Sequence, residues 1–406
     1  MKKLLSVSLL AMALATNGFA AEAQSPKGIK HMDHVYVIML ENHAYGQILN
    51  NPSAPFINQL AKSANVATNY FGVAHPSLTN YLEVVGGSNF GVLSDNSPDW
   101  HSTSCVPNIL AGTANTDNPA SGNICPIAGT GTDAATPLFD YMNEAQGTTP
   151  EINIDGVHSF PAGETVGKTI ADQLVNANRT WKSYQEDVPA SGPDRVDYAD
   201  GFFSNLTPGV SQKDIVALYA AKHNPFVYFQ AVQEGQDPRL SLKQTAGFDG
   251  TNGLFADLRS GHMPAFSFIA PNQCDDQHGR GNAGPFCNYD PTDNGTQNGL
   301  NPALILRGDM TVQKIVTAIK GSRSWREGNN AIVILWDEND YSLAPNTNQV
   351  MLIVDTNNGR HGVQSSKFYT HFSLLKTLEA GFGLPCLNHA CDANVQVMSD
   401  LFGKED

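Results

Sequence analysis

The sequence predicts an α/β fold in which a mainly parallel central sheet is sandwiched by helices. Short apolar runs typical of strands recur along the chain, segments with helical character separate them, and some runs are apolar throughout, as in strands buried on both faces. The strand-like runs are 35–40, 225–231, 264–269, 331–336 and 350–354. The helix-like segments are 55–64, 136–145, 168–177, 212–222, 251–259, 302–320 and 371–380.

Two of the strand-like runs end directly in oxygen donors. The run AIVILW passes into Asp337 and Glu338, and the run VYVIML passes into Glu41 and Asn42. Open α/β sheets bind ligands at the carboxyl ends of their parallel strands. If the two strands are neighbours, these four side chains can converge on one cation, so the pattern predicts a metal site.

The first twenty residues predict a secretory signal peptide. Lys2 and Lys3 precede an apolar core that is too short to span a membrane, and small residues surround the expected cleavage point after Ala20. Residues 21–406 are then one domain, expected in the periplasm or outside the cell and without a transmembrane segment. The formal charge of −15, with 24 Lys and Arg against 39 Asp and Glu, argues against nucleic acid as a partner.

The six cysteines indicate disulfides, because a secreted chain folds in an oxidising compartment. Proximity in sequence suggests the pairs Cys105 with Cys125, Cys274 with Cys287, and Cys386 with Cys391, although six cysteines permit about 15 pairings. Two of these pairs lie in long polar segments, 88–135 and 271–301. We expect both segments to be ordered loop insertions near the site, since a disulfide argues against disorder.

Ser77 is the candidate nucleophile. The segment AHPSLTNYLEVVGG predicts a helix that starts near Pro76 and stops at Gly86, which places Ser77 in the first turn. Backbone N–H groups and the helix dipole favour a phosphate and an alkoxide there, and a divalent cation activates such a serine for attack on phosphorus. From this segment alone, a capping serine is the simpler interpretation.

Several segments, in order along the chain, resemble the bacterial and fungal phosphoesterase family of secreted acid phosphatases and phospholipases C. The segments are HVYVIMLENHAYG, AHPSLTNYLEVVGG, TWKSYQED, KHNPFVYF, PNQCDDQHG, ILWDEND and THFSLLKTLEAGFGLPCL. Together they span about residues 33–390. The resemblance implies an alkaline phosphatase-like fold and hydrolysis of phosphate esters.

By position, the resemblance also implies roles for individual residues. Glu41 and Asn42 match the family's first pair of metal ligands, and Asp337 and Glu338 match the last pair. Ser77 matches the nucleophile, which is also a metal ligand.

The serine segment also resembles the nucleotide pyrophosphatase pattern, in which a hydroxyl residue precedes an asparagine by three positions. Ser77 and Asn80 have this spacing. Thr79, the rival hydroxyl, stands where the family more often has proline.

Other candidates surround the proposed nucleophile. His278 and Asp276 follow the strand-like run 264–269, so they are expected at the same sheet edge, where His278 would bind a phosphoryl oxygen or protonate the leaving group. Asn80 is expected to help neutralise the phosphoryl oxygens. His75 and His361 are candidates for phosphate contact, and Asp276 is a candidate for substrate binding. For each histidine, a purely structural contact or a surface loop is the competing interpretation.

The hypothesis that follows is a secreted, metal-dependent acid phosphatase that hydrolyses phosphate monoesters through a phosphoserine on Ser77. Oxygen and amide ligands favour Ca²⁺, Mg²⁺ or Mn²⁺, with Zn²⁺ left open. A first alternative is a phospholipase C or other phosphodiesterase that acts on a phospholipid head group. A second is a secreted cation-binding protein without turnover, although the presence of all the proposed ligands together with Ser77 favours an enzyme.

Overall fold

The computed structural model describes most of the chain. The described residues are 24–92, 94–98, 105–107, 109–110, 124–133, 160, 162–189, 192–193, 218–278, 287, 302–339 and 347–403. The predicted signal peptide at 1–20, the predicted helix at 136–145 and the first part of the one at 212–222 lie outside these residues. None of the helices in the described ranges combines the length and the apolar character that a bilayer-spanning segment needs.

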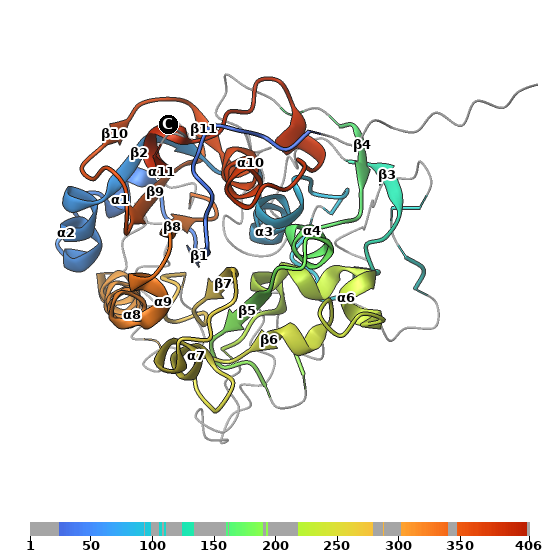
Figure 1. Ribbon diagram of the computed structural model, residues 1–406, viewed down its shortest axis with the longest axis horizontal. Coiled ribbons are helices and arrows are strands. Elements are labelled where there is room, and N and C mark those ends of the chain that lie inside the picture. The colour runs from blue at the N-terminus through green and yellow to red at the C-terminus, as the bar shows by residue number, and fades with distance from the viewer. Residues whose placement is uncertain are drawn as a thin grey trace, which may run out of the picture.

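A large sheet runs through the middle of the described part of the chain (Figure 1). Its strand order is β10-β2-β9-β8-β1-β7-β5-β6, and β11 also pairs with β2. The strands are β1 His34–Leu40, β2 Asn65–Phe71, β5 Trp181–Gln185, β6 Thr245–Ala246, β7 Phe266–Ala270, β8 Asn330–Trp336, β9 Gln349–Thr356, β10 Gln364–Ser365 and β11 Tyr369–Thr370. A separate antiparallel pair is formed by β3 Thr130–Thr132 and β4 Glu164–Val166.

The sheet is mainly parallel, as predicted. Strand β1 lies between β8 and β7 and is parallel to both, and β5 continues the parallel arrangement beside β7. Strand β9 is the exception, because it runs antiparallel to both of its neighbours, β8 and β2.

Helices cover both faces of this sheet (Figure 1). One group contains α3 Ser77–Gly86, α4 Ile170–Asn176 and α10 His371–Phe382, and the other contains α2 Pro55–Ser63, α7 Leu254–Ser260, α8 Pro302–Gly321 and α9 Arg323–Arg326. The shorter elements are α1 Tyr45–Ile48, η2 Ala221–His223, η3 Pro225–Tyr228, α6 Gln230–Glu234, η4 Leu242–Gln244, η6 Asn388–Cys391 and α11 Ser399–Phe402. The predicted α/β sandwich is therefore confirmed.

One predicted strand is wrong. The run 225–231 forms the 3₁₀ helix η3 and the start of α6 instead. Pro225 supplies no N–H for a strand ladder, and every residue of η3 is buried, so the apolar run reflects burial on all sides and not an extended backbone. Conversely, β2 and β5 were not predicted, because their sequences NVATNYF and WKSYQ mix polar and apolar residues.

The register of β1 against β8 brings the two oxygen-bearing strand ends together. Leu40 lies beside Trp336 in the ladder, and the N–H of Asp337 donates to the carbonyl oxygen of Leu40 at 3.0 Å. Glu41 and Asp337 therefore leave the sheet side by side, as the sequence pattern predicted.

The three predicted disulfides are confirmed. They join Cys105 to Cys125, Cys274 to Cys287, and Cys386 to Cys391.

Candidate functional site

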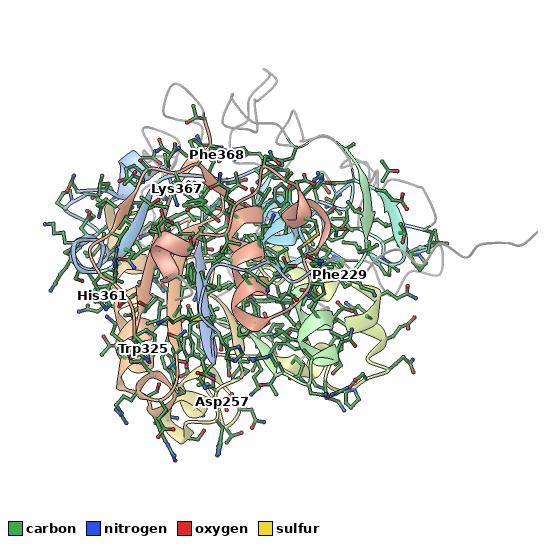
Figure 2. All side chains as sticks on the ribbon, turned by 45° about the horizontal axis from the view of Figure 1, so that its top comes forward. Phe229, Asp257, Trp325, His361, Lys367 and Phe368 are labelled. Atoms are coloured by element: carbon green, nitrogen blue, oxygen red, sulfur yellow. A yellow bond between two sulfur atoms is a disulfide. The ribbon has the colours of Figure 1, made fainter. Side chains whose placement is uncertain are left out.

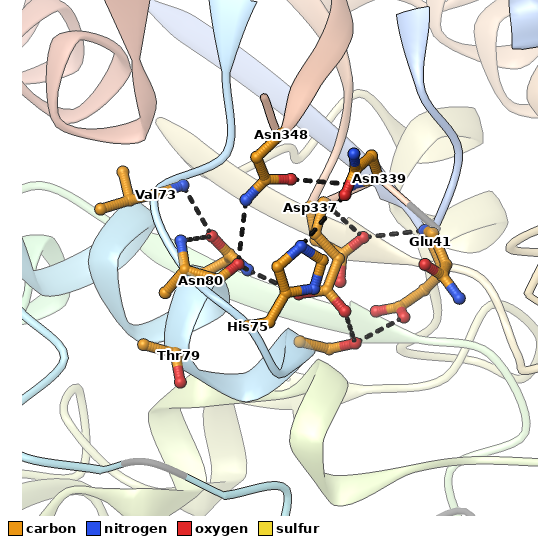
Figure 3. A network of polar contacts seen from close by, with 12 residues as sticks. Glu41, Val73, His75, Thr79, Asn80, Asp337, Asn339 and Asn348 are labelled. Atoms are coloured by element: carbon orange, nitrogen blue, oxygen red, sulfur yellow. Dashed lines mark hydrogen bonds and ion pairs between the residues drawn. The ribbon is translucent and has the colours of Figure 1, made fainter. Parts of the chain in front are cut away.

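Ser77 belongs to a buried polar network at the carboxyl edge of the sheet. Figure 3 shows Glu41, Asn80 and Asp337 of this network. Ser77 is the first residue of α3, directly after Pro76. Its hydroxyl lies 2.9 Å from Oε2 of Glu41 and 3.1 Å from Oε1 of Glu338. A serine hydroxyl with carboxylate oxygens on two sides is held in one place, which is what a nucleophile needs.

The rival hydroxyl of Thr79 faces elsewhere. It donates to the carbonyl oxygen of Val92 at 3.3 Å, and it points away from the carboxylates in Figure 3. Of these two hydroxyls, Ser77 is thus the one that meets the strand-end acids.

Asp337, the first of the two acids that follow β8, is fixed by backbone N–H groups. Its Oδ1 accepts hydrogen bonds from the N–H of Asn42 at 2.9 Å and from the N–H of Glu338 at 2.7 Å. Asn42 reaches this position with a φ of 56°, in the left-handed region that asparagine tolerates better than most residues. His371 completes the arrangement, since its Nε2 lies 2.6 Å from the carbonyl oxygen of Asp337.

His75 and Asn80 both hold Glu338. Nδ1 of His75 lies 2.9 Å from Oε2 of Glu338, and its Nε2 lies 3.1 Å from Oδ1 of Asn339. The amide nitrogen of Asn80 donates to the same Oε2 at 3.0 Å and to the carbonyl oxygen of Ala74 at 2.8 Å. With both amide hydrogens used in this conformation, Asn80 orients Glu338 and has no hydrogen left for a phosphoryl oxygen.

A histidine that the sequence did not single out joins the site. Nε2 of His223 lies 3.0 Å from Oε1 of Glu41, and its Nδ1 lies 3.4 Å from Oδ2 of Asp276. Its ring stacks on Tyr81 of α3, with 5.2 Å between centroids. The backbone N–H of Glu41 donates to the carbonyl oxygen of Asp276 at 2.9 Å, which brings Asp276 to the same sheet edge. The backbone N–H of His278 donates to Oδ1 of Asp276 at 2.9 Å.

Lys222 and Asp95 were also missed. Nζ of Lys222 lies 2.8 Å from Oδ2 of Asp95 and 3.4 Å from the hydroxyl oxygen of Ser77. Asp95 belongs to the loop segment 88–135, as Asp276 belongs to 271–301, so the described parts of both predicted insertions reach the site. No sequence pattern singles out Asp95, because the residues around it are rich in Gly and Asn.

For Lys222 and His223 a signal existed. Both residues open the segment KHNPFVYF, one of those that resemble the family, directly before an apolar run that has the pattern of a strand.

The electrostatics of the site indicate a surplus of buried negative charge. Burial raises the pKa of Glu41, but the charges of His223 and Lys222 outweigh burial and hold it well below its usual range. Burial, and then the charge of Glu41, raise the pKa values of Asp276 and Asp337 well above their usual range. These carboxylates compete for the positive charge of His223 and Lys222, and a bound cation would neutralise the negative charge that remains.

The donor set fits a divalent cation in its chemistry. Oδ1 of Asn42 and Oδ2 of Asp337 are buried without a hydrogen-bond partner, and both adjoin the acids that meet Ser77. Among the described residues, no three His, Cys, Asp or Glu side chains form a ready-made metal cluster. A cation here therefore depends on the amide oxygen of Asn42 and the hydroxyl of Ser77 as well as on the acids.

The structure does not bring His361, a candidate for phosphate contact, to this site. His361 follows β9, and because β9 runs antiparallel to β8, its carboxyl end lies at the opposite edge of the sheet from Glu338. His361 is exposed at the periphery of the molecule (Figure 2), with Nδ1 3.5 Å from Oδ1 of Asp355.

Comparison with known proteins places this chain in a family. The model of the Phosphoesterase family matches residues 47–385. The chain belongs to the Phosphoesterase family, and its class is that of hydrolases acting on phosphate esters. Glu41 and Asn42 lie just before the matched range, so their place in the site rests on the register of β1 against β8.

Curated relatives carry phosphatase names. The chain is 24% identical over 404 residues to a phosphatidylinositol-3-phosphatase of Mycobacterium tuberculosis, covering 98% of this chain and 92% of that protein. It is 22% identical over 347 residues to an acid phosphatase of Aspergillus fumigatus, covering 83% of this chain and 52% of the relative. The chain thus spans about half the length of that fungal relative.

Solved structures are more distant. The phosphonate monoester hydrolase of Agrobacterium radiobacter is 12% identical with a TM-score of 0.45, over 92% of this chain and 78% of that one. A Vibrio parahaemolyticus protein in the alkaline phosphatase superfamily is 10% identical with a TM-score of 0.41, over 91% and 72%. Scores this low carry no argument about the site.

Proposed function

We propose that this protein is a secreted, metal-dependent acid phosphatase that hydrolyses phosphate monoesters through a phosphoserine on Ser77. The observation that carries the proposal is the position of the Ser77 hydroxyl, buried at the start of α3 within 3.1 Å of both Glu41 and Glu338. The relatives named as acid phosphatases support the same reaction class.

In the proposed reaction Ser77 attacks as an alkoxide, its proton having been released to water. Its oxygen forms a bond to phosphorus while the bond from phosphorus to the leaving oxygen breaks, and the leaving group departs with that electron pair and takes a proton. Water then attacks the phosphoserine, which releases inorganic phosphate and restores the serine.

The protein's own groups account for much of this chemistry. Ser77 opens α3, so the positive end of the helix dipole lies at the serine and favours the negative charge of a phosphoryl group there. Glu338, fixed by His75 and Asn80, keeps the serine oxygen in position. His223 and His278 lie on the side of Glu41 and Asp276, where an imidazolium would protonate the leaving oxygen.

The proposed metal ligands are Glu41, Asn42, Ser77, Asp337 and Glu338. A divalent cation bound there would supply positive charge that favours the serine alkoxide and neutralises the phosphoryl oxygens. Because all five donors are oxygens, the ion is Ca²⁺, Mg²⁺ or Mn²⁺ in preference to Zn²⁺.

The test is to compare Ser77→Ala with Thr79→Ala on an aryl phosphate. We expect Ser77→Ala to lose at least ~10⁴-fold in kcat, as loss of a covalent nucleophile does in other hydrolases. Thr79→Ala is the matched control from the same helix and should retain activity at equal folded concentration. Undiminished turnover by Ser77→Ala would refute the proposed role.

A phosphorylated lipid head group is a second candidate for the substrate. It is favoured by the relative named phosphatidylinositol-3-phosphatase, which this chain matches over nearly its whole length. The reaction is still hydrolysis of a phosphate monoester. Rates on phosphatidylinositol 3-phosphate in vesicles, on an aryl phosphate and on phosphatidylcholine would separate this substrate from a general phosphatase and from a phospholipase C.

A further inference from the structure

We infer that Lys222 is a catalytic residue that stabilises the serine oxygen and the phosphoryl group transferred to it, and that Asp95 is the positioning residue that holds Lys222 there. The inference rests on the proposed function and deepens it. The observation behind it is a buried chain of contacts from the carboxylate of Asp95 through the ammonium group of Lys222 to the hydroxyl of Ser77.

The burial of Lys222 needs an explanation. In the part of the chain that the structure describes, it is the only lysine or arginine that is buried, at 2% exposure. Placing an ammonium group in the interior costs several kcal/mol unless other groups compensate it. The ion pair with Asp95 provides that compensation, but a purely structural pair would not have to be located 3.4 Å from the proposed nucleophile.

Asp95 uses both carboxylate oxygens in this arrangement. Oδ2 binds Lys222 at 2.8 Å, and Oδ1 accepts the N–H of Leu78, the residue after Ser77, at 2.9 Å. One side chain therefore fixes the ammonium group to the same turn of α3 that carries the serine. The distance between Lys222 and Ser77 is set by this connection and does not depend on a flexible side chain alone.

The long contact between Lys222 and Ser77 suits a group that acts as charge develops. In the resting site the serine hydroxyl donates toward Glu41 and Glu338, so its oxygen is free to accept from the ammonium group. When the serine becomes an alkoxide, the same contact joins two full opposite charges and becomes much stronger. Once the bond to phosphorus forms, the ammonium lies next to the phosphoryl oxygens and stabilises them by its fixed charge.

The experiment compares Lys222→Met, Lys222→Arg and Asp95→Asn with wild type, all with metal added, on aryl phosphates that differ in leaving-group pKa. We expect Lys222→Met to lose about 10²–10³-fold in kcat/KM, as loss of one preorganised donor does elsewhere. The loss should be equal for all leaving groups, because the ammonium contacts the serine oxygen and not the leaving oxygen. Lys222→Arg should recover part of the activity, and Asp95→Asn should lower kcat more than it changes KM.

Lys182→Met is the matched control. Lys182 also pairs with a carboxylate, that of Asp257, but away from Ser77. It should retain wild-type kcat/KM.

Two results would overturn the inference. The first is a Lys222→Met variant that melts at a lower temperature but keeps kcat/KM within about threefold in its folded fraction, which would make the pair structural. The second is a loss that grows with leaving-group pKa, which would make Lys222 the acid for the leaving group. If Lys222→Met does not fold, Asp95→Asn decides by the same two criteria.

Failure of the inference can be told apart from failure of the proposed function. An inactive Ser77→Ala beside a fully active Lys222→Met defeats only the role of Lys222. An active Ser77→Ala defeats both.

Discussion

Replacement of Glu338 by glutamine perturbs the site with the smallest change in shape. The carboxylate of Glu338 has contacts on both oxygens: Ser77 at 3.1 Å on Oε1, and Asn80 at 3.0 Å and His75 at 2.9 Å on Oε2. An amide keeps one oxygen and places an NH₂ group where the other stood. With the NH₂ group in place of Oε2, it faces the donating amide nitrogen of Asn80; with the NH₂ group in place of Oε1, the Ser77 hydroxyl loses its acceptor there and can only accept from the amide.

The size of the effect follows from these contacts. A hydrogen bond to a charged group contributes about 1.5–3 kcal/mol, and Glu338→Gln weakens or removes at least two of them around Ser77. A loss of about 3–5 kcal/mol in the transition state corresponds to about 10²–10⁴-fold in kcat/KM, since 1.36 kcal/mol is tenfold. Loss of one negative charge from the proposed metal site acts in the same direction.

The assay is kcat/KM for an aryl phosphate, with protein folding monitored by circular dichroism. Glu379→Gln is the matched control, because Glu379 is another fully buried glutamate, on α10, whose Oε1 accepts from Gln173 and not from a site residue. It should retain wild-type kcat/KM. A folded Glu338→Gln enzyme with kcat/KM within about threefold of wild type, at saturating metal, would refute the role given to Glu338.

Three further predictions concern metal, pH and the sheet edges. Dialysis against a chelator should abolish most activity, and Ca²⁺, Mg²⁺ or Mn²⁺ should restore it; full activity in metal-free protein would exclude the cation. Burial raises the pKa values of Glu83 and Glu379 well above 4.5, so each contributes stability that is present below that pH and is lost as the pH rises through the folded-state pKa. The melting temperature should therefore fall from pH 4.5 toward neutrality, and fall less in Glu83→Gln and Glu379→Gln; equal slopes in all three proteins would contradict this. His361→Ala should change kcat/KM by less than about twofold, as exposed positions away from a site do, and a larger loss would return His361 to the site.

The parts of the fold that the sequence predicted are those with strong, simple patterns. Strands β1 and β8 are apolar along their length and end in acids, so both their burial and their functional end could be inferred. The direction of β9 could not, because a short apolar run is the same in either direction. That reversal is what moved His361 to the other edge of the sheet.

The site residues also divide into those that a local sequence pattern predicts and those that it does not. Glu41, Asn42, Asp337 and Glu338 follow strands, and Ser77 opens a helix with clear start and stop residues, so local patterns locate them. The other contributors come from turns and loops that have no periodicity. Lys222, His223 and Asp95 reach the site only through the three-dimensional packing of η2 and a loop against α3.

In the proposed reaction Ser77 carries the phosphoryl group during turnover. The most direct measurement is acid quench of the enzyme during steady-state hydrolysis of a phosphate monoester, followed by peptide mass spectrometry. We expect a phosphate on the peptide that contains Ser77, located on that residue. The Ser77→Ala variant should lack it. Phosphate on a different side chain, or no phosphorylated peptide while product is being formed, would contradict it.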